Sequence, residues 1–367
     1  DNLTGCVSAS ASGTITVQSV VASATFGTNQ TICPGNTAIL TFTGTPNGVV
    51  TFSSSTGAFY TVTLNAAGTA SFTTPVLTLT TVYTLESITL TPPGCSNPLS
   101  GSVTITINSN GCASILAGDL NLNPFIPSIC NVGECVDLLA EYIDLGSTTA
   151  YTVSSIPYCP QAAFQGPGFT PVSVNIDDVW SGNIPLPFNF CFFGVNYASA
   201  NIGSNGVISF DSYAAGAYCN WPFTQTIPNA GFPIRNAIYG VYQDINPAVA
   251  PTPPAVTSIN YQLMGTYPCR KLVVNFSNVA QFSCNNSVGL QTSQVVLYEI
   301  SNIIEVYVQR RVPCLGWNSG SGLIGIQNAA GSLAYTPPGR NTGTWSAFDE
   351  AWRFTPSGPS ATTFTWF

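Results

Sequence analysis

Alternation of apolar and polar residues with a period of two runs through most of this sequence and constrains its fold more than any other feature. In Tyr60–Leu64 the apolar side chains point to one face of an extended chain and the threonines to the other. Thr81–Leu90 and Val103–Ile107 alternate similarly, and Gly, Pro and Asn interrupt the runs. This pattern is typical of half-buried β-strands, and helical periodicity is nearly absent. The sequence therefore predicts an all-β protein.

An internal repeat divides the chain. Gly5-Cys6 precedes the alternating run Ser12–Val17, and Gly94-Cys95 precedes the similar run Ser102–Ile107. The copies lie about 90 residues apart, the size of an immunoglobulin-type sandwich. We therefore expect tandem β-sandwiches, an Ig-like repeat followed by a larger, jelly-roll-like one. The predicted parts are the last strand of a preceding Ig-like repeat (1–18), an Ig-like sandwich (19–108), the larger sandwich (109–355), and a linker with the first strand of a following domain (356–367).

The cysteines indicate the compartment. The chain has 12 of them and no histidine, and the closest pair, Cys130 and Cys135, lacks a second pair at metal-binding spacing. Structural zinc sites need four such ligands, so disulfides are the better interpretation. Disulfides persist outside the reducing cytosol, and we expect an extracellular protein.

Sequence spacing suggests three of the disulfides. Cys33 and Cys95 stand near the two ends of the Ig-like sandwich, and their bridge would close a loop of about 60 residues, worth on the order of 4 kcal/mol. Cys284 and Cys314 bracket a predicted hairpin whose turn is Ile300–Asn302, because Asn tolerates a positive φ. Cys191–Cys219 is the third proposed pair. The connectivity of the other cysteines stays open.

The scarcity of basic residues and the lack of a long apolar stretch exclude two classes of partner. Only 6% of residues are charged, with seven basic and 15 acidic side chains. Nucleic-acid binding requires clustered Lys and Arg, so no nucleic acid is expected as a partner. No stretch approaches the ~18 apolar residues of a membrane span, so no membrane insertion is expected either.

Catalysis is difficult to build from these residues, and we expect no enzyme activity. Without histidine there is no Ser-His-Asp or Cys-His arrangement. Glu299 and Glu305 flank the predicted hairpin turn, where they are interpreted as surface charges on an outward face. A carboxylate pair for glycoside hydrolysis would have to come from Asp177, Asp178, Asp211, Asp244, Glu299 and Glu305.

Calcium is the one cofactor that the sequence suggests. Ca²⁺ takes six to eight oxygen ligands, often from loop carboxylates, Asn side chains and carbonyls. Asp177 and Asp178 stand in one predicted loop, and Asp244 and Asn246 stand in another, after a buried strand. The alternative for Asp244 and Asn246 is an Asx-turn before Pro247, in which the side chains accept backbone N–H groups.

Tryptophans offer a carbohydrate-binding alternative, because an indole face can stack on a sugar ring. A tryptophan in a β-sandwich is more often part of the core, and Trp352, which alternates with Phe354, is interpreted in this way. Trp221 and Trp317 lie in Gly/Pro/Asn-rich loops beside cysteines. We therefore predict that these two are exposed and bind the carbohydrate.

Several long strings resemble one class of protein. Ile32–Phe52 ("ICPGNTAILTFTGTPNGVVTF") resembles the Ig/PKD-like repeats of very large surface adhesins of the Bacteroidota. Val174–Gly194 and Asn236–Pro247 ("NAIYGVYQDINP") resemble a recurrent module of the same proteins, and Ile202–Phe210 ("IGSNGVISF") resembles nidogen-like domains. The resemblance implies export by type IX secretion, a role in gliding motility or attachment, and association with the outer membrane through regions outside this chain.

The predicted function is that of a non-enzymatic adhesin segment at the cell surface, a structural stalk with a binding module. Its expected partners are adjacent domains of the same polypeptide and surface glycans or proteins. One alternative is an extracellular filament subunit in which the Asp1–Val21 strand completes a neighbour's sheet. A second alternative is a secreted carbohydrate-active enzyme or carbohydrate-binding protein.

Overall fold

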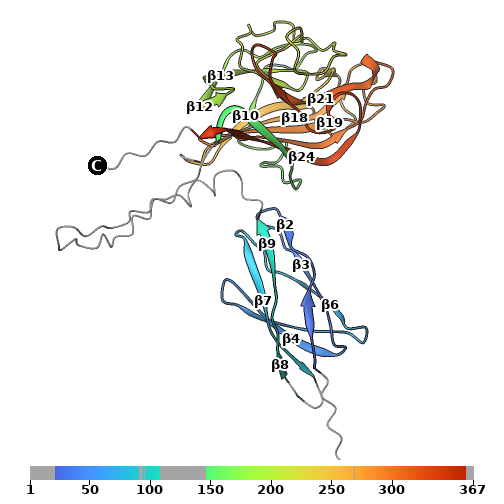
Figure 1. Ribbon diagram of the computed structural model, residues 1–367. Helices are drawn as coiled ribbons and strands as arrows, with labels where there is room; N and C mark the ends of the chain where they lie inside the picture. The colour runs from blue at the N-terminus through green and yellow to red at the C-terminus, as the bar shows by residue number, and fades with distance from the viewer. Residues whose placement is uncertain (1–20, 91–93, 95, 108–145, 268, 361–367) are drawn as a thin grey trace, which may run out of the picture. The chain divides into compact units, whose positions relative to one another are not determined.

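The computed structural model describes residues 21–90, 94, 96–107, 146–267 and 269–360, and the chain divides into two compact units, Asp1–Ile107 and Asn108–Phe367. Figure 1 shows that both are built from β-sheets. Apart from the short 3-10 turn η1 (Asn318–Gly320), the described elements are all strands. The predicted fold class, all-β with tandem β-sandwiches, is confirmed.

The smaller unit packs two sheets face to face. One sheet has the order β1-β3-β6 and the other β2-β9-β7-β4-β5, with β8 beside β7. The pairs are antiparallel except β2 with β9. The strands are β1 (Ala24–Phe26), β2 (Gln30–Ile32), β3 (Ile39–Gly44), β4 (Gly48–Ser54), β5 (Phe59–Thr63), β6 (Thr69–Thr73), β7 (Thr81–Leu90), β8 (Ser96–Pro98) and β9 (Ser102–Ile107).

Aromatic residues form the centre of this unit's core. Phe52 is fully buried, and its ring centroid lies 5.0 Å from that of Phe42 and 5.2 Å from that of Phe72. Burial alternates along β4, so the period-two pattern produces one inward face. The strand predicted within residues 1–18 lies outside the described residues, and so does Cys95 of the predicted Cys33–Cys95 pair.

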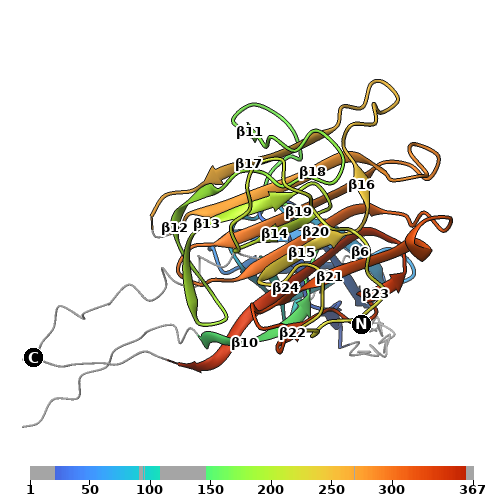
Figure 2. The same cartoon turned by 90° about the horizontal axis from the view of Figure 1, so that it is seen from above.

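The larger unit is a second sandwich. Its eight-stranded sheet has the order β10-β24-β20-β19-β18-β17-β11 with β16 beside β18, and its seven-stranded sheet has the order β12-β13-β14-β15-β21-β22 with β23 beside β21. Figure 2 shows β17, β18, β19, β20 and β24 running side by side. The strands are β10 (Gly146–Ser155), β11 (Thr170–Pro171), β12 (Ile184–Phe192), β13 (Val195–Gly203), β14 (Val207–Ser209), β15 (Ala237–Tyr242), β16 (Ile245–Asn246), β17 (Ser258–Met264), β18 (Lys271–Gln281), β19 (Gln291–Tyr298), β20 (Ile304–Arg311), β21 (Ser321–Gln327), β22 (Ala334–Tyr335), β23 (Asn341–Thr344) and β24 (Ala347–Ser360).

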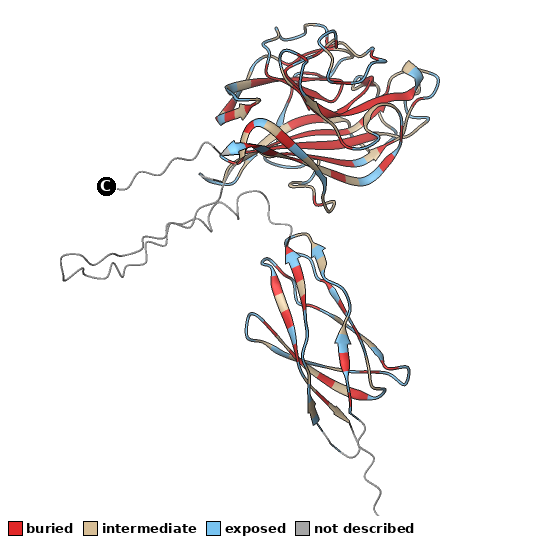
Figure 3. Cartoon of the chain, viewed as in Figure 1, coloured by how far each residue is buried: buried red, intermediate tan, exposed pale blue. Residues whose placement is uncertain are grey.

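Several central strands of this unit are buried on both faces, as the red ribbons of Figure 3 show. Val295 and Leu297 of β19 face the core between the sheets. Gln294, on the opposite face of β19, donates from its side-chain amide to the Ala162 carbonyl oxygen at 3.0 Å. The segment between β10 and β11 therefore covers the outer face of the eight-stranded sheet. A second small core, which includes Trp180 and Tyr239, covers the outer face of the other sheet.

The predicted hairpin is confirmed. Strands β19 and β20 pair antiparallel up to Leu297 and Ile304. Asn302 has a φ of 50°, as the turn chemistry requires, and Ile300 has a φ of 62°. The predicted Cys284–Cys314 disulfide is present and brackets this hairpin.

The predicted Cys191–Cys219 disulfide is wrong, because both cysteines are free. Cys191 lies on β12 between two core residues and turns its Sγ to the Thr148 hydroxyl, at 2.9 Å. Cys219 is buried in the small outer core beside Trp180, where a Cβ on Gly203 would stand 2.5 Å from its Sγ. The two thiols thus face different surroundings.

The linker predicted to begin at residue 356 is also wrong, because β24 continues to Ser360 and pairs with β10. Pro356 lies opposite Tyr151 of β10. The pairing of β24 with β20 starts at Phe354, so the strand has no β20 neighbour beyond that point. A proline is tolerated at such an edge position, where no ladder hydrogen bond is lost.

Candidate functional site

Three carboxylates meet at one place in the larger unit. Asp177 and Asp178 come from the loop between β11 and β12, and Asp244 lies between β15 and β16. One carboxylate oxygen of each residue lies within 4.8 Å of the other two. The sequence suggested two alternative calcium sites, and the structure brings their acidic residues together. We call Asp177, Asp178 and Asp244 the carboxylate cluster.

Asn205 fixes the two loops of the cluster to each other. Its side-chain amide donates to Asp178 Oδ1 at 2.8 Å, and its Oδ1 accepts the Ile245 N–H at 3.1 Å. The residue is fully buried in the turn between β13 and β14. Gly206 follows with a φ of 80°, and a Cβ there would stand 2.1 Å from the Val241 carbonyl oxygen. Sequence reasoning missed Asn205, although the Asn-Gly turn signal was present.

Asn246, the fourth predicted ligand, has a different role. Its Oδ1 accepts the Ala248 N–H at 2.8 Å, which is the Asx-turn that the sequence offered as the alternative. The side-chain oxygen of Asn246 is therefore already hydrogen-bonded within the turn.

Burial makes the cluster electrostatically unusual. Asp244 is 4% exposed, and its Oδ1 has no hydrogen-bond partner. Burial, with a smaller effect of the neighbouring Asp178 and Asp177 charges, raises the pKa of Asp244 to about 7. Burial and the Asp178 charge raise the pKa of Asp177 to about 6. The pKa of Asp178 is also raised by burial, against hydrogen bonds from Asn205 and Trp221.

The cluster has the chemistry of a site for a hard cation. Two like charges within 4.8 Å of each other repel by roughly 3 kcal/mol or more at an effective dielectric constant of about 20. The buried oxygens Asp177 Oδ1 and Asp244 Oδ1 lack hydrogen-bond donors. A divalent cation would neutralise the charges and supply the missing partner, and all-oxygen ligation is what Ca²⁺ prefers.

Two tryptophans adjoin the cluster. Trp317 Nε1 donates to Asp244 Oδ2 at 2.6 Å, and the Trp221 side chain lies close enough to Asp178 to lower the pKa of that carboxyl group. The rings of Trp221 and Trp317 lie 5.2 Å apart, and both side chains are partly exposed. The predicted carbohydrate ligands are thus neighbours of each other and of the predicted calcium ligands. Trp180 and Trp345 are buried, and Trp352 packs partly buried against the core.

The Cys284–Cys314 disulfide secures the loop that holds Trp317. The backbone N–H of Trp317 donates to the Cys314 carbonyl oxygen at 3.1 Å. On the other side of the bridge, Phe282 N–H donates to the Asp244 carbonyl oxygen, and its ring lies 4.8 Å from that of Trp317. One tryptophan and one carboxylate are therefore positioned by the same covalently closed region.

The other candidate carboxylates do not join this site. Glu299 and Glu305 were interpreted as surface charges, and this is wrong, because both are buried and paired with arginines. Arg270 binds Glu299 at 2.5 Å, and Arg353 binds Glu305 at 2.6 Å. Asp211 instead accepts the Asn236 side-chain amide at 2.8 Å.

The model of the NIDO-related family matches residues 151–366 of this chain, which is more than half of its length and includes every residue of the site. The chain belongs to the NIDO-related family. No curated protein matches it. A NIDO-related domain is a nidogen-like extracellular module, and this domain together with the Cys284–Cys314 disulfide indicates a secreted or extracellular protein. Within the described residues no helix has the length and apolar character needed to span a membrane.

The pKa values of the cluster predict how calcium binding to the NIDO-related unit depends on pH. Ca²⁺ requires ionised carboxylates, so protons compete as the pH falls through about 7 and then about 6. Without calcium the sign is opposite, because a raised folded-state pKa favours the fold as the pH falls from about 7 toward the unfolded value of about 4. We expect the Ca²⁺-induced rise in Tm to be large at about pH 8 and lost at about pH 5.

Differential scanning calorimetry with and without excess calcium measures this effect directly. The same protein without calcium provides the control at each pH. A calcium-induced Tm shift that is equal at both pH values would contradict the role of these carboxylates.

Proposed function

We propose that this chain is a non-enzymatic segment of a cell-surface adhesin, whose NIDO-related unit binds Ca²⁺ at the carboxylate cluster and a glycan at the adjacent Trp221 and Trp317. The smaller sandwich serves as a structural stalk. The carboxylate cluster positions the two indoles, so glycan binding depends on calcium.

One observation supports this proposal most strongly. The residues that suggest calcium and those that suggest a carbohydrate come from four separate stretches of sequence, yet Asp244 and Trp317 share a hydrogen bond. Trp221 and Trp317 lie ring beside ring and keep part of their surface in contact with solvent. Paired, partly exposed aromatic rings beside ordered polar groups are typical of recognition surfaces.

The proposal of a non-enzymatic role rests on the absence of histidine and on how the carboxylates are paired. The chain has no histidine, and Glu299 and Glu305 are each neutralised by an arginine. A glycosidase needs one carboxyl group free to donate a proton and a second that acts as base or nucleophile. The clustered aspartates are instead close enough to share one cation.

The finer assignment to gliding-motility adhesins of the Bacteroidota, exported by type IX secretion and held at the outer membrane, is supported by the resemblance of strings such as Ile32–Phe52. A filament subunit that assembles by strand addition remains the second candidate. Its proposed donor strand, Asp1–Val21, lies almost wholly outside the described residues, so the argument for it is the internal repeat in the sequence.

A glycan array probed with the purified chain tests the proposed function. We expect binding with calcium and at least about tenfold weaker binding after its chelation or after Trp221→Ala with Trp317→Ala, because aromatic anchors carry much of a binding energy. Tyr267→Ala is the matched control, since this ring is 74% exposed and stands near Arg270, outside the cluster. Absence of binding to every glycan in both conditions would overturn the carbohydrate assignment.

A further inference from the structure

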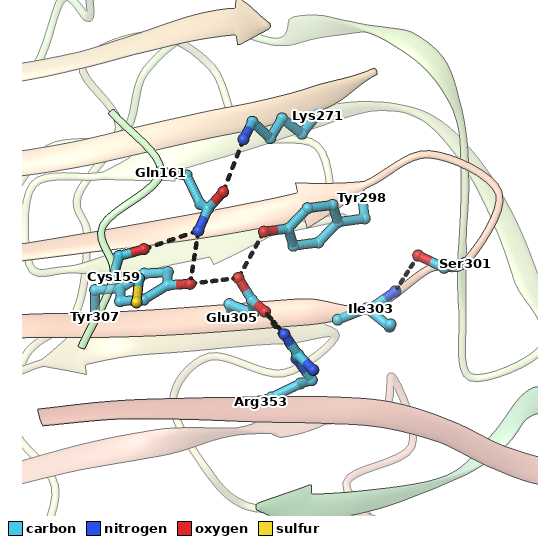
Figure 4. Close-up of polar contacts among 9 residues, drawn as sticks. All are labelled: Cys159, Gln161, Lys271, Tyr298, Ser301, Ile303, Glu305, Tyr307 and Arg353. Atoms are coloured by element: carbon cyan, nitrogen blue, oxygen red, sulfur yellow. Dashed lines mark hydrogen bonds and ion pairs between the residues drawn. The ribbon is translucent and has the colours of Figure 1, made fainter. Parts of the chain in front are cut away.

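A second polar cluster lies on the outer face of the eight-stranded sheet, apart from the carboxylate cluster. Figure 4 shows Lys271 of β18 and Gln161 of the covering segment pointing toward each other above Tyr298, Glu305 and Tyr307. Lys271 is the only lysine in the chain. Its Nζ lies 2.8 Å from Gln161 Oε1. The one primary amine among the side chains is thus placed beside a carboxamide carbonyl.

The Gln161 carboxamide is held on both sides. Its Nε2 donates to the Cys159 carbonyl oxygen at 2.8 Å and to the Tyr307 hydroxyl at 3.0 Å. The backbone N–H of Gln161 donates to Gln294 Oε1 at 2.6 Å and holds the main chain of this residue. The carbonyl end faces Lys271 and the nitrogen end faces Cys159 and Tyr307, so the orientation of the amide is fixed by three hydrogen bonds.

Glu305 lies below this amide and is fully buried. Its Oε2 accepts the hydroxyls of Tyr298 and Tyr307, each at 2.6 Å, and its Oε1 pairs with Arg353. A hydrogen-bonded chain therefore runs from Gln161 Nε2 through Tyr307 to Glu305. Burial lowers the pKa of the Lys271 amine, and the nearby Glu305 charge, which is paired with Arg353, opposes this shift in part. The neutral, nucleophilic form of this amine is therefore easier to reach than that of a solvated lysine.

We propose that Lys271 and Gln161 form an intramolecular isopeptide bond. Lys271 Nζ attacks Gln161 Cδ, the Nζ–Cδ bond forms and the Cδ–Nε2 bond breaks. The amine loses one proton, the leaving Nε2 gains one, and ammonia departs. The Tyr307 hydroxyl, which contacts both Nε2 and Glu305, donates its proton to Nε2, and Glu305 takes up the proton that the amine loses and returns it to Tyr307. No oxidant, reductant or second substrate is required.

The fixed positions of the Lys271 amine and the Gln161 carboxamide favour the reaction. Two groups held in contact inside a folded protein react as if at a very high effective concentration. The amine stands at the start of β18, paired with Tyr298, and the carboxamide is fixed by the bonds described above. The product would join the covering segment covalently to the sheet.

Intact-mass spectrometry of the reduced protein tests the proposal. The expected wild-type mass is lower than the sequence mass by one molecule of ammonia, and digestion yields a branched peptide that joins the Gln161 and Lys271 fragments. Lys271→Arg keeps the positive charge but removes the nucleophilic amine, so this variant should have the full sequence mass.

Tyr307→Phe keeps the ring and removes only the hydroxyl of the relay. We expect this variant to form the bond more slowly, as a mixture of the two masses that converts with time. A wild-type protein of full mass with two separate peptides would overturn the proposal, and so would a loss of ammonia that persists in Lys271→Arg. The wild-type measurement decides the question even if a variant fails to fold.

Discussion

Replacement of Glu305 by glutamine is expected to lower the free energy of unfolding of the NIDO-related unit by about 3 kcal/mol, the lower end of the range for breaking a buried ion pair from one side. Glu305 is fully buried, whereas Arg353 keeps 21% of its side chain exposed and recovers part of its hydration. Glutamine has a similar shape but removes the negative charge that accepts from Arg353 and from the Tyr298 and Tyr307 hydroxyls.

Urea unfolding measured by tryptophan fluorescence checks this value. Asp349→Asn is the control, because it removes the same charge from an exposed residue and Asn tolerates the φ of 50° found there. The control should stay within about 0.5 kcal/mol of the wild type. A loss below about 1 kcal/mol in Glu305→Gln would mean that the buried charge contributes little to the fold.

The prediction about Glu305 depends on a feature that the sequence alone did not reveal. Val306 and Val308 of β20 face the core, and Glu305 lies on the opposite, outward-directed face of the strand, as predicted. Alternation shows which residues share a face but does not show what covers that face. The covering residues lie near Gln161, more than a hundred positions earlier in the chain, and no local pattern links them to β20.

Local signals were sufficient where structure is local. The run Thr81–Leu90 is β7 with the predicted bounds, and the turn signal at Asn302 correctly located the hairpin. The linker expected at residue 356 shows the limit of such signals. Proline and glycine there favoured a break, but β10 supplied a partner strand along one edge and β24 continued.

The candidate site was predictable in its parts but not as a whole. Loop carboxylates and loop tryptophans can be found by residue type and by their Gly/Pro/Asn surroundings. Their convergence depends on Asn205, whose side chain bridges the Asp178 loop and Ile245. Tertiary contacts of this kind have no signature in one sequence, and this is also why Cys191 and Cys219 were paired wrongly.

Calcium is expected to raise the Tm of the NIDO-related unit by about 5–10 °C when it is present at about 100 times its Kd. Binding to the folded state alone contributes about 2.7 kcal/mol under that condition. For a unit of this size, each kcal/mol corresponds to about 2–4 °C. Asp244→Asn should abolish the shift, because Asp244 is the most buried member of the cluster and presents an unpartnered oxygen to it.

Asp244→Asn also shows whether Asp244 is a calcium ligand or only a structural residue. Above pH 7 the ionised, buried Asp244 carboxylate works against the fold, since its pKa is raised to about 7. Without calcium at about pH 8, Asp244→Asn should therefore be at least as stable as the wild type, with its amide oxygen still able to accept from Trp317. A purely structural aspartate would instead give a variant that is less stable with and without calcium.

Asp211→Asn is the matched control, because Asp211 is an exposed acid outside the cluster and should keep the full calcium response. Mg²⁺ should stabilise less than Ca²⁺, since it requires a near-ideal octahedron at shorter distances and gives up its water reluctantly. Scanning calorimetry on the three proteins with each cation, followed by chelation, measures all of these differences. A calcium response that survives in Asp244→Asn would place the binding site elsewhere in the chain.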